Sequence, residues 1–208
     1  ETPVLGPQAG GALARPFETH YNALDQDFYL RIATELHLKR LLVGGFERVY
    51  EIGRIFRNEG ISTKHNPEFT TLESYQAYAD YQDVMAMVEQ MVAHIAQEVL
   101  GGTQVQYKSA TLELAPPWRR LTLREAIQEH SGVDFLAHPD AASLRAALAA
   151  KGIQSDPSAG YGKLVDELLS TFVEPQLVQP TFLVDYPVEL SPLAKRKTED
   201  PRLVERFE

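Results

Sequence analysis

The alternation of side chains along residues 47–78 predicts two strands joined by a polar loop, Asn58 to Pro67, which is rich in turn-forming residues. Because successive side chains of a strand point to opposite faces, every second residue shares a face. One face therefore carries Glu51, Gly53, Ile55 and Arg57 from the first strand, and Phe69, Thr71, Glu73 and Tyr75 from the second.

This mixture of charged and aromatic side chains does not suit a hydrophobic core. A buried charge that lacks its partner costs about 3–5 kcal/mol. A guanidinium, a flat ring, a carboxylate and a phenol on one face instead suit a small ligand with an anionic group, a cationic group and a ring. The pattern by itself leaves a second interpretation open, namely a solvated hairpin face with ordinary cross-strand ion pairs.

Helical periodicity and capping signals predict the remaining elements. Thr34 is expected to cap a helix over 35–43 that Gly44 and Gly45 end. Asp80 can cap a longer helix over about 82–100, and the apolar stripe of this helix is expected to pack in the core. The stripe consists of Val84, Met87, Val88, Met91 and Ile95.

The second half of the chain is expected to alternate short strands and helices. Strands are predicted there over 105–108, 111–114 and 177–186, and helices from Thr122, over 140–150 and over 163–173. In the first half, a further short strand is predicted over 28–32. Together these elements predict an α+β fold, a mostly antiparallel sheet flanked by helices, with a small helical insertion at about 126–160.

Composition and charge narrow the function classes. The 208 residues, 44% of them hydrophobic, can form one sizeable core, and the absence of cysteine excludes disulfides and thiolate metal sites. No apolar run approaches the ~20 residues of a membrane-spanning helix and no signal peptide is visible, so a soluble, reducing compartment is expected. The net charge of −9 means that a nucleic-acid contact would need a local basic patch. Lys195-Arg196-Lys197 is one candidate, although so short a run is more often a solvated loop.

Several motifs carry a resemblance to a known family. Arg57-Asn58-Glu59 and then His65-Asn66-Pro67-Glu68-Phe69 resemble motif 2 of the class II aminoacyl-tRNA synthetases, and the string from Phe56 to Tyr78 resembles the lysyl-tRNA synthetase version. Ser74 departs from that pattern, because a bulkier apolar residue is expected there. Further stretches that match are Glu1-Thr2-Pro3, Gly10-Gly11-Ala12, Asn22-Ala23-Leu24-Asp25, Gln179-Pro180-Thr181-Phe182 and Ser191-Pro192-Leu193-Ala194.

The resemblance implies a fold of the class II synthetase type and a role for individual residues. Arg57 matches the catalytic arginine of motif 2, which contacts both the nucleotide and the amino-acid carboxylate, and Phe69 offers its ring to adenine. The implied ATP-binding residues are Arg57, Glu59, His65, Asn66 and Phe69. The implied lysine-binding residues are Gly11, Glu35, Arg57, Glu73 and Tyr75. No residue is assigned as a metal ligand.

The implied activity is ATP-dependent activation of lysine to lysyl-adenylate, followed by transfer to tRNA(Lys). The resemblance also implies ATP as substrate, Mg²⁺ with ligands outside this chain, a homodimer, a cytoplasmic location and no membrane partner. Motif 3, the front of motif 1 and the anticodon-binding domain are not found in residues 1–208, so we expect a partial catalytic domain that is inactive or impaired alone. Two alternatives stay open: a synthetase paralogue that attaches a lysine-like amino acid to a protein, and a non-catalytic module that binds ATP or the amino acid.

Overall fold

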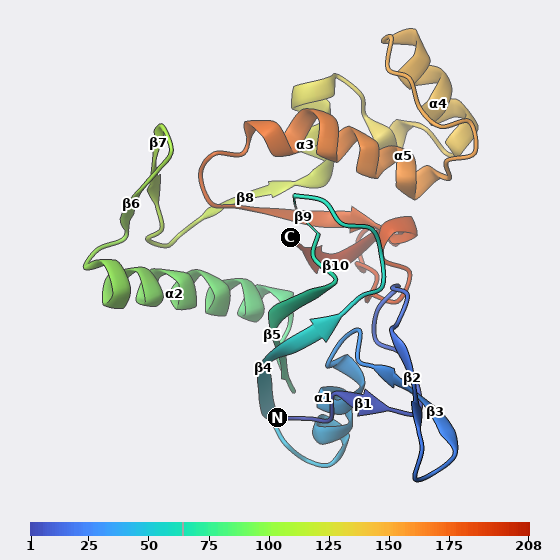
Figure 1. The fold of residues 1–208 in the computed structure, drawn as a ribbon. Helices are drawn as coiled ribbons and strands as arrows, with labels where there is room; N and C mark the ends of the chain where they lie inside the picture. The colour runs from blue at the N-terminus through green and yellow to red at the C-terminus, as the bar shows by residue number, and fades with distance from the viewer. Residues whose placement is uncertain (64) are drawn as a thin grey trace. The chain divides into compact units, whose positions relative to one another are not determined.

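The computed structural model describes residues 1–63 and 65–208, which form two compact units, Glu1–Ala79 and Asp80–Glu208 (Figure 1). Both units combine helices with strands, and the strand pairs are antiparallel apart from the parallel pair β8–β9. This composition confirms the predicted α+β class. No helix in the described part of the chain is both long and apolar enough to cross a membrane.

The first unit contains a three-stranded antiparallel sheet of order β1-β3-β2, one helix and a separate hairpin. The bounds are Leu5–Gly6 (β1), Glu18–Tyr21 (β2), Gln26–Leu30 (β3), Glu35–Val43 (α1), Arg48–Phe56 (β4) and Glu68–Gln76 (β5). The predicted helix 35–43 is confirmed, and the predicted strand 28–32 is shifted by two residues. The apolar core of this unit is small and includes Ile32, Leu38 and Ile55, which are at most 3% exposed.

The hairpin β4–β5 has an unbroken antiparallel register from Arg48 opposite Gln76 to Phe56 opposite Glu68. Glu51 therefore lies opposite Glu73 on the face that the sequence analysis singled out, and this face is the more covered one. The opposite face carries exposed side chains such as Tyr50, which is 72% exposed. The predicted division of faces is confirmed, and a fully solvated hairpin face does not fit this burial.

A buried ion pair fastens β4 to the residues that follow β3. Arg31 Nη1 donates to Glu51 Oε1 at 2.5 Å, and the two side chains are only 8% and 2% exposed. The Thr2 hydroxyl donates to Glu51 Oε2 at 2.6 Å, and Arg31 Nε donates to the Arg54 carbonyl at 2.8 Å. Burial alone would raise the pKa of the Glu51 carboxyl, but the hydrogen bonds from Thr2 and Arg31 bring that pKa below its ordinary value.

Gly53 provides the space that this ion pair needs. A Cβ at Gly53 would lie 2.3 Å from Arg31 Nη2, a distance that two non-bonded heavy atoms do not adopt. The absence of a side chain at this point of β4 therefore lets the guanidinium come close to the strand.

The second unit begins with the long helix α2 and continues as alternating strands and helices. Its elements are α2 (Tyr81–Leu100), β6 (Gln104–Tyr107), β7 (Ala110–Glu113), β8 (Arg119–Thr122), α3 (Leu123–Ser131), α4 (Ala141–Ala150), α5 (Tyr161–Leu168), β9 (Thr181–Pro187) and β10 (Leu203–Phe207). Single turns of 3-10 helix occur at Phe135–Ala137, Glu174–Gln176 and Val188–Leu190, and a π-helical turn extends α5 over Leu169–Val173.

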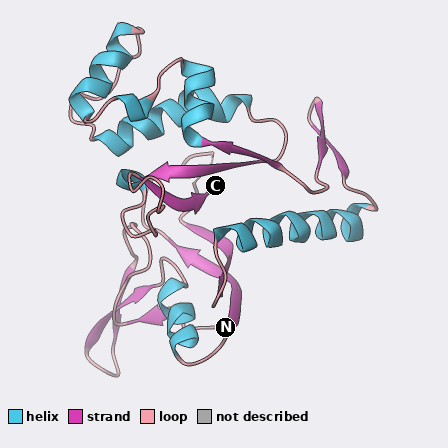
Figure 2. Ribbon diagram, turned by 180° about the vertical axis from the view of Figure 1, so that it is seen from behind, coloured by secondary structure: helices cyan, strands magenta, loops and turns pink. Residues whose placement is uncertain are grey.

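Helices α3, α4 and α5 gather on one side of the sheet β10-β9-β8 (Figure 2). Leu144, Leu164 and Phe135 are fully buried there and join one continuous apolar cluster with Leu121 of β8 and Leu183 of β9. Part of the segment that we expected to be an insertion, 126–160, thus shares its core with the strands around it. The predicted capping signals at Asp80 and Thr122 are confirmed, since each side chain accepts hydrogen bonds from the first turn of its helix. Asp140 caps α4 in the same way, which the sequence analysis did not predict.

One expectation for this unit needs correction. The apolar stripe of α2 is only partly buried, because Met87 and Ile95 are 38% and 52% exposed, whereas the buried positions include Met85 and Glu89. Glu89 is buried because it forms a tertiary ion pair, in which Arg120 Nη2 lies 3.3 Å from Glu89 Oε1.

The basic run 195–197 lies in a largely exposed loop, which agrees with the favoured interpretation of this run as a solvated loop. Lys195 pairs with Glu205, and Lys197 pairs with Asp185. Arg196 Nη1 donates to the Pro201 carbonyl at 2.9 Å. All three side chains thus have partners within the unit.

We predict that Arg31→Met destabilises the protein by about 3–5 kcal/mol, because it leaves the Glu51 carboxylate buried without its cation. The control is Arg54→Met, which removes an exposed ion pair with Glu68 and should cost less than about 1 kcal/mol. Urea unfolding of both variants gives the comparison. Equal losses for the two variants would contradict the importance of the buried pair.

Candidate functional site

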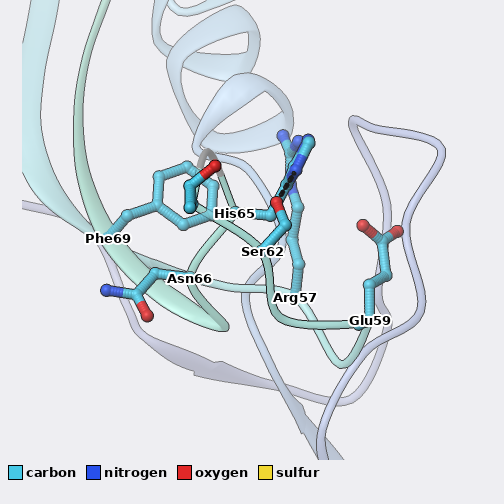
Figure 3. A pocket seen from close by; sticks show the side chains of 8 residues that line it. Arg57, Glu59, Ser62, His65, Asn66 and Phe69 are labelled. Carbon is cyan, nitrogen blue, oxygen red and sulfur yellow. Dashed lines mark hydrogen bonds between the residues drawn. The ribbon is translucent and has the colours of Figure 1, made fainter.

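The loop between β4 and β5 encloses a cavity of about 480 Å³ (Figure 3). The described residues that line it are Arg57, Glu59, Gly60, Ser62, Thr63, His65, Asn66 and Phe69. All five residues predicted to bind ATP are therefore brought together in one hollow. The size falls in the range of small-molecule sites, which is about 300–1,000 Å³.

Arg57 is held from two sides at the mouth of the loop. Its Nε donates to the Ile32 carbonyl at 3.3 Å, and its Cζ lies 5.3 Å from the centre of the Phe69 ring. A guanidinium over an aromatic face is attracted by the ring electrons, by about 0.5–1 kcal/mol at an exposed site. Arg57 and Phe69, which the sequence analysis both assigned to ATP, are thus in contact with each other.

The backbone of the loop closes on itself. The Arg57 amide donates to the Pro67 carbonyl at 2.8 Å, so the ladder of the hairpin continues one step beyond β4. Further along, the amides of Ser62 and His65 each donate to the other's carbonyl, and Ser62 Oγ lies 2.8 Å from His65 Nδ1. These contacts give the polar lining of the cavity a defined shape, and Figure 3 marks the Ser62–His65 bond.

A second group of residues forms an acidic corner, which we define as Glu35, Glu73 and Tyr75. Tyr75 donates its hydroxyl to Glu73 Oε1 at 2.5 Å. Burial raises the pKa of the Tyr75 phenol above its ordinary value, and the hydrogen bond to Glu73 and the negative charges of Glu73 and Glu35 raise it further. The phenol therefore stays protonated, and both carboxylates lie close enough for their charge to act on it.

The acidic corner already holds an alkylammonium group, that of Lys39. Lys39 Nζ forms an ion pair with Glu35 and lies 5.6 Å from the centre of the Tyr75 ring. The corner thus offers a cation both a carboxylate and an aromatic face. In chemical terms, this arrangement can bind an amine.

Gly11 lies against the start of α1, beside this corner. Its φ of +90° belongs to the left-handed region that favours glycine. A Cβ at this position would lie 3.0 Å from the Glu35 Cβ and 3.2 Å from the Ala33 Cβ. Any side chain would therefore push against the residue that carries the corner's first carboxylate.

The predicted lysine-binding residues occupy two neighbouring places on the first unit. Gly11, Glu35, Glu73 and Tyr75 belong to the corner, whereas Arg57 lines the loop cavity. The hydrogen bond from Arg57 to the Ile32 carbonyl links the two places, because Ile32 is two residues before Thr34 in the chain. Among the described residues, no group of three or more His, Asp or Glu side chains is placed to hold a metal ion.

Sequence reasoning missed the role of Thr34. We expected its side chain to cap α1, but the hydroxyl makes no capping hydrogen bond. It donates instead to Glu73 Oε2 at 2.6 Å. The two residues are 39 positions apart, so no local signal in the sequence could have indicated the contact. Lys39 was missed for a simpler reason, because an i,i+4 pair with Glu35 is an ordinary feature of a helix surface.

The chain is similar to known proteins along its whole length. The family model for tRNA synthetases class II (D, K and N) matches residues 1–208. The chain is 62% identical to the lysine--tRNA ligase of Dehalococcoides mccartyi (strain 195) and 61% identical to that of Moorella thermoacetica, over all 208 residues in each case. It is 54% identical to the lysine--tRNA ligase of Prochlorococcus marinus (strain MIT 9303). The chain spans 42%, 42% and 41% of the length of these three proteins. The match across its whole length shows that the chain belongs to the class II tRNA synthetases of the D, K and N group.

Proposed function

We propose that the chain is a part of the catalytic domain of a lysine--tRNA ligase. In this proposal it activates lysine with ATP to form lysyl-adenylate, and the lysyl group then passes to tRNA(Lys). The names of its relatives support the amino acid and the tRNA. The domain is expected to include a helical insertion at about 126–160.

One observation carries the proposal. Strand β5 places the Phe69 ring, beside the loop cavity, and the Glu73–Tyr75 pair, in the acidic corner, on the same covered face. Phe69 and Glu73 are four residues apart, which is about 13 Å along a strand. A nucleotide bound at one end and an amine bound at the other could therefore meet between them, near Arg57.

The reaction requires the protein to position the two reactants and to neutralise their negative charge. A carboxylate oxygen of lysine forms a bond to the α-phosphorus of ATP, and the bond from that phosphorus to the bridging oxygen breaks, so that pyrophosphate leaves. No side chain has to act as a nucleophile. Arg57 is suited to this step, because a guanidinium keeps its proton and can contact a carboxylate and a phosphate together. Holding two anions in the attacking geometry is the main source of rate enhancement in such a site.

The other residues complete the two subsites. Phe69 stacks on the adenine ring, and Glu59, His65 and Asn66 contact the nucleotide from the loop. Glu35, Glu73 and Tyr75 receive the ammonium groups of lysine, with the backbone of Gly11 close to the α-amino group. The ammonium of Lys39 over Tyr75 supports this assignment, because it is the same functional group in the same surroundings.

The proposal includes partners and conditions that follow from the activity. Mg²⁺ accompanies ATP, with protein ligands outside residues 1–208. The active form is a homodimer in the cytoplasm, where tRNA is charged, and no membrane partner is needed. A paralogue that transfers lysine to a protein would share the first half-reaction, so only the acceptor distinguishes it.

The direct test is amino-acid-dependent exchange of pyrophosphate into ATP, measured on the full-length gene product. We expect lysine to support exchange and the other standard amino acids to support little or none. Exchange with a different amino acid would end the lysine assignment. Binding of ATP and lysine without any exchange would favour the non-catalytic module, and aminoacylation of tRNA(Lys) would exclude the protein-modifying paralogue.

Arg57→Ala should lower kcat for exchange more than tenfold, because removal of a preorganised donor from a developing negative charge costs about 3–4 kcal/mol. Arg54→Ala is the matched control, since Arg54 lies on the opposite face of β4 and pairs with Glu68 at the surface. We expect this control to keep at least half of the activity. Unchanged turnover in Arg57→Ala, with the fold intact by circular dichroism, would remove Arg57 from the proposed role.

The two subsites should separate in steady-state kinetics. Phe69→Ala should raise KM for ATP about fivefold or more, because base stacking contributes about 1–3 kcal/mol, and should leave KM for lysine within twofold. Glu73→Gln should raise KM for lysine and leave KM for ATP within twofold. If both substitutions raise the same KM, then the assignment of the cavity to ATP and of the corner to lysine is wrong.

A further inference from the structure

Thr34 is one of the few polar residues in the described chain that are almost completely buried, with 1% exposure. Both of its donors face the same carboxylate oxygen. The hydroxyl donates to Glu73 Oε2 at 2.6 Å, and the backbone amide donates to the same atom at 3.2 Å. These bonds connect the first residues of α1 to the middle of β5.

The position of Thr34 makes this use of its hydroxyl unusual. It occupies the N-cap of α1, where a threonine side chain ordinarily accepts a hydrogen bond from an amide of the first turn. Such a cap contributes about 0.5–2 kcal/mol to a helix. Here the backbone of Thr34 is in the α region and the side chain makes no capping bond. The hydroxyl serves Glu73 instead of the helix.

The consequence is a carboxylate with a single direction left for a further donor. An ionised carboxylate offers about four acceptor positions. Among the described residues, Thr34 fills two of them on Oε2 and Tyr75 fills one on Oε1. The remaining position lies on Oε1, next to the phenol, and the rotation of the carboxylate is restricted by bonds at both oxygens.

We propose that Thr34 is a positioning residue that sets the selectivity of the site for an ammonium group. By holding Oε2, it directs the open acceptor position of Glu73 Oε1 towards the amine of the bound amino acid. The inference deepens the proposed function and rests on it, since it concerns the same lysine subsite. Thr34 does not contact the substrate and acts only through Glu73.

Thr34→Val and Thr34→Ser, made in the full-length gene product, test this inference. Valine keeps the shape and the backbone amide but removes the hydroxyl, whereas serine keeps the hydroxyl. We expect Thr34→Val to raise KM for lysine about ten- to hundredfold, as for the loss of a hydrogen bond to a charged group, with KM for ATP within twofold. Thr34→Ser should stay within about threefold of the unaltered protein for both substrates.

A merely structural role gives a different result. If Thr34 only supports the fold, then Thr34→Val lowers the thermal midpoint and the total activity, while both KM values of the folded fraction stay unchanged. That outcome would overturn the inference, and so would an equal rise in KM for lysine in the serine variant. Should Thr34→Val fail to fold, Thr34→Ala compared with Thr34→Ser provides the same contrast with a smaller side chain.

Failure of the proposed function can be told apart from failure of this inference. If the unaltered protein exchanges pyrophosphate with another amino acid and not with lysine, then the proposed function is wrong, and the ammonium selectivity assigned to Thr34 is wrong with it. If lysine supports exchange and Thr34→Val behaves like the unaltered protein, then the proposed function stands and only the inference on Thr34 is rejected.

Discussion

The structure of the first unit depends on polar contacts between the segment that follows β3 and the hairpin β4–β5. Arg31 pairs with Glu51, the Ile32 carbonyl accepts from Arg57, and Thr34 donates to Glu73. Buried polar groups are costly unless they are paired, so each contact restricts how the segment can lie on the hairpin. Because the unit's apolar core is small, these polar contacts have an unusually large share in fixing its geometry.

The same contacts couple the two parts of the proposed active site. Ile32 and Thr34 lie two residues apart, and they hold the arginine of the loop cavity and the carboxylate of the acidic corner respectively. A displacement of this short segment would therefore shift both subsites at once. Positioning of two anionic reactants needs such common support, since errors of about 1 Å can cost about two orders of magnitude in rate.

The second unit shows a different balance of forces. A continuous apolar cluster joins its three-stranded sheet to α3, α4 and α5, and helix caps at Asp80, Thr122 and Asp140 define where the helices begin. Its most basic run, 195–197, is engaged by partners within the unit.

The sequence by itself determined the elements with strong local signals and the face of the hairpin that carries chemistry. Period-two alternation places Phe69, Glu73 and Tyr75 on one side whatever the strand packs against, and the capping motifs lie within four residues of the helices that they start. Tertiary structure decided the short strands β1, β8 and β10, the burial of Met85 and Glu89 in place of Met87 and Ile95, and the diversion of the Thr34 hydroxyl to Glu73. The pairings of β1, β8 and β10 join residues from 16 positions apart, as Leu203 with Pro187, to 62 positions apart, as Arg119 with Thr181. Glu89 and Arg120 are 31 positions apart, and Thr34 and Glu73 are 39 apart. Local propensity carries no information about such pairings.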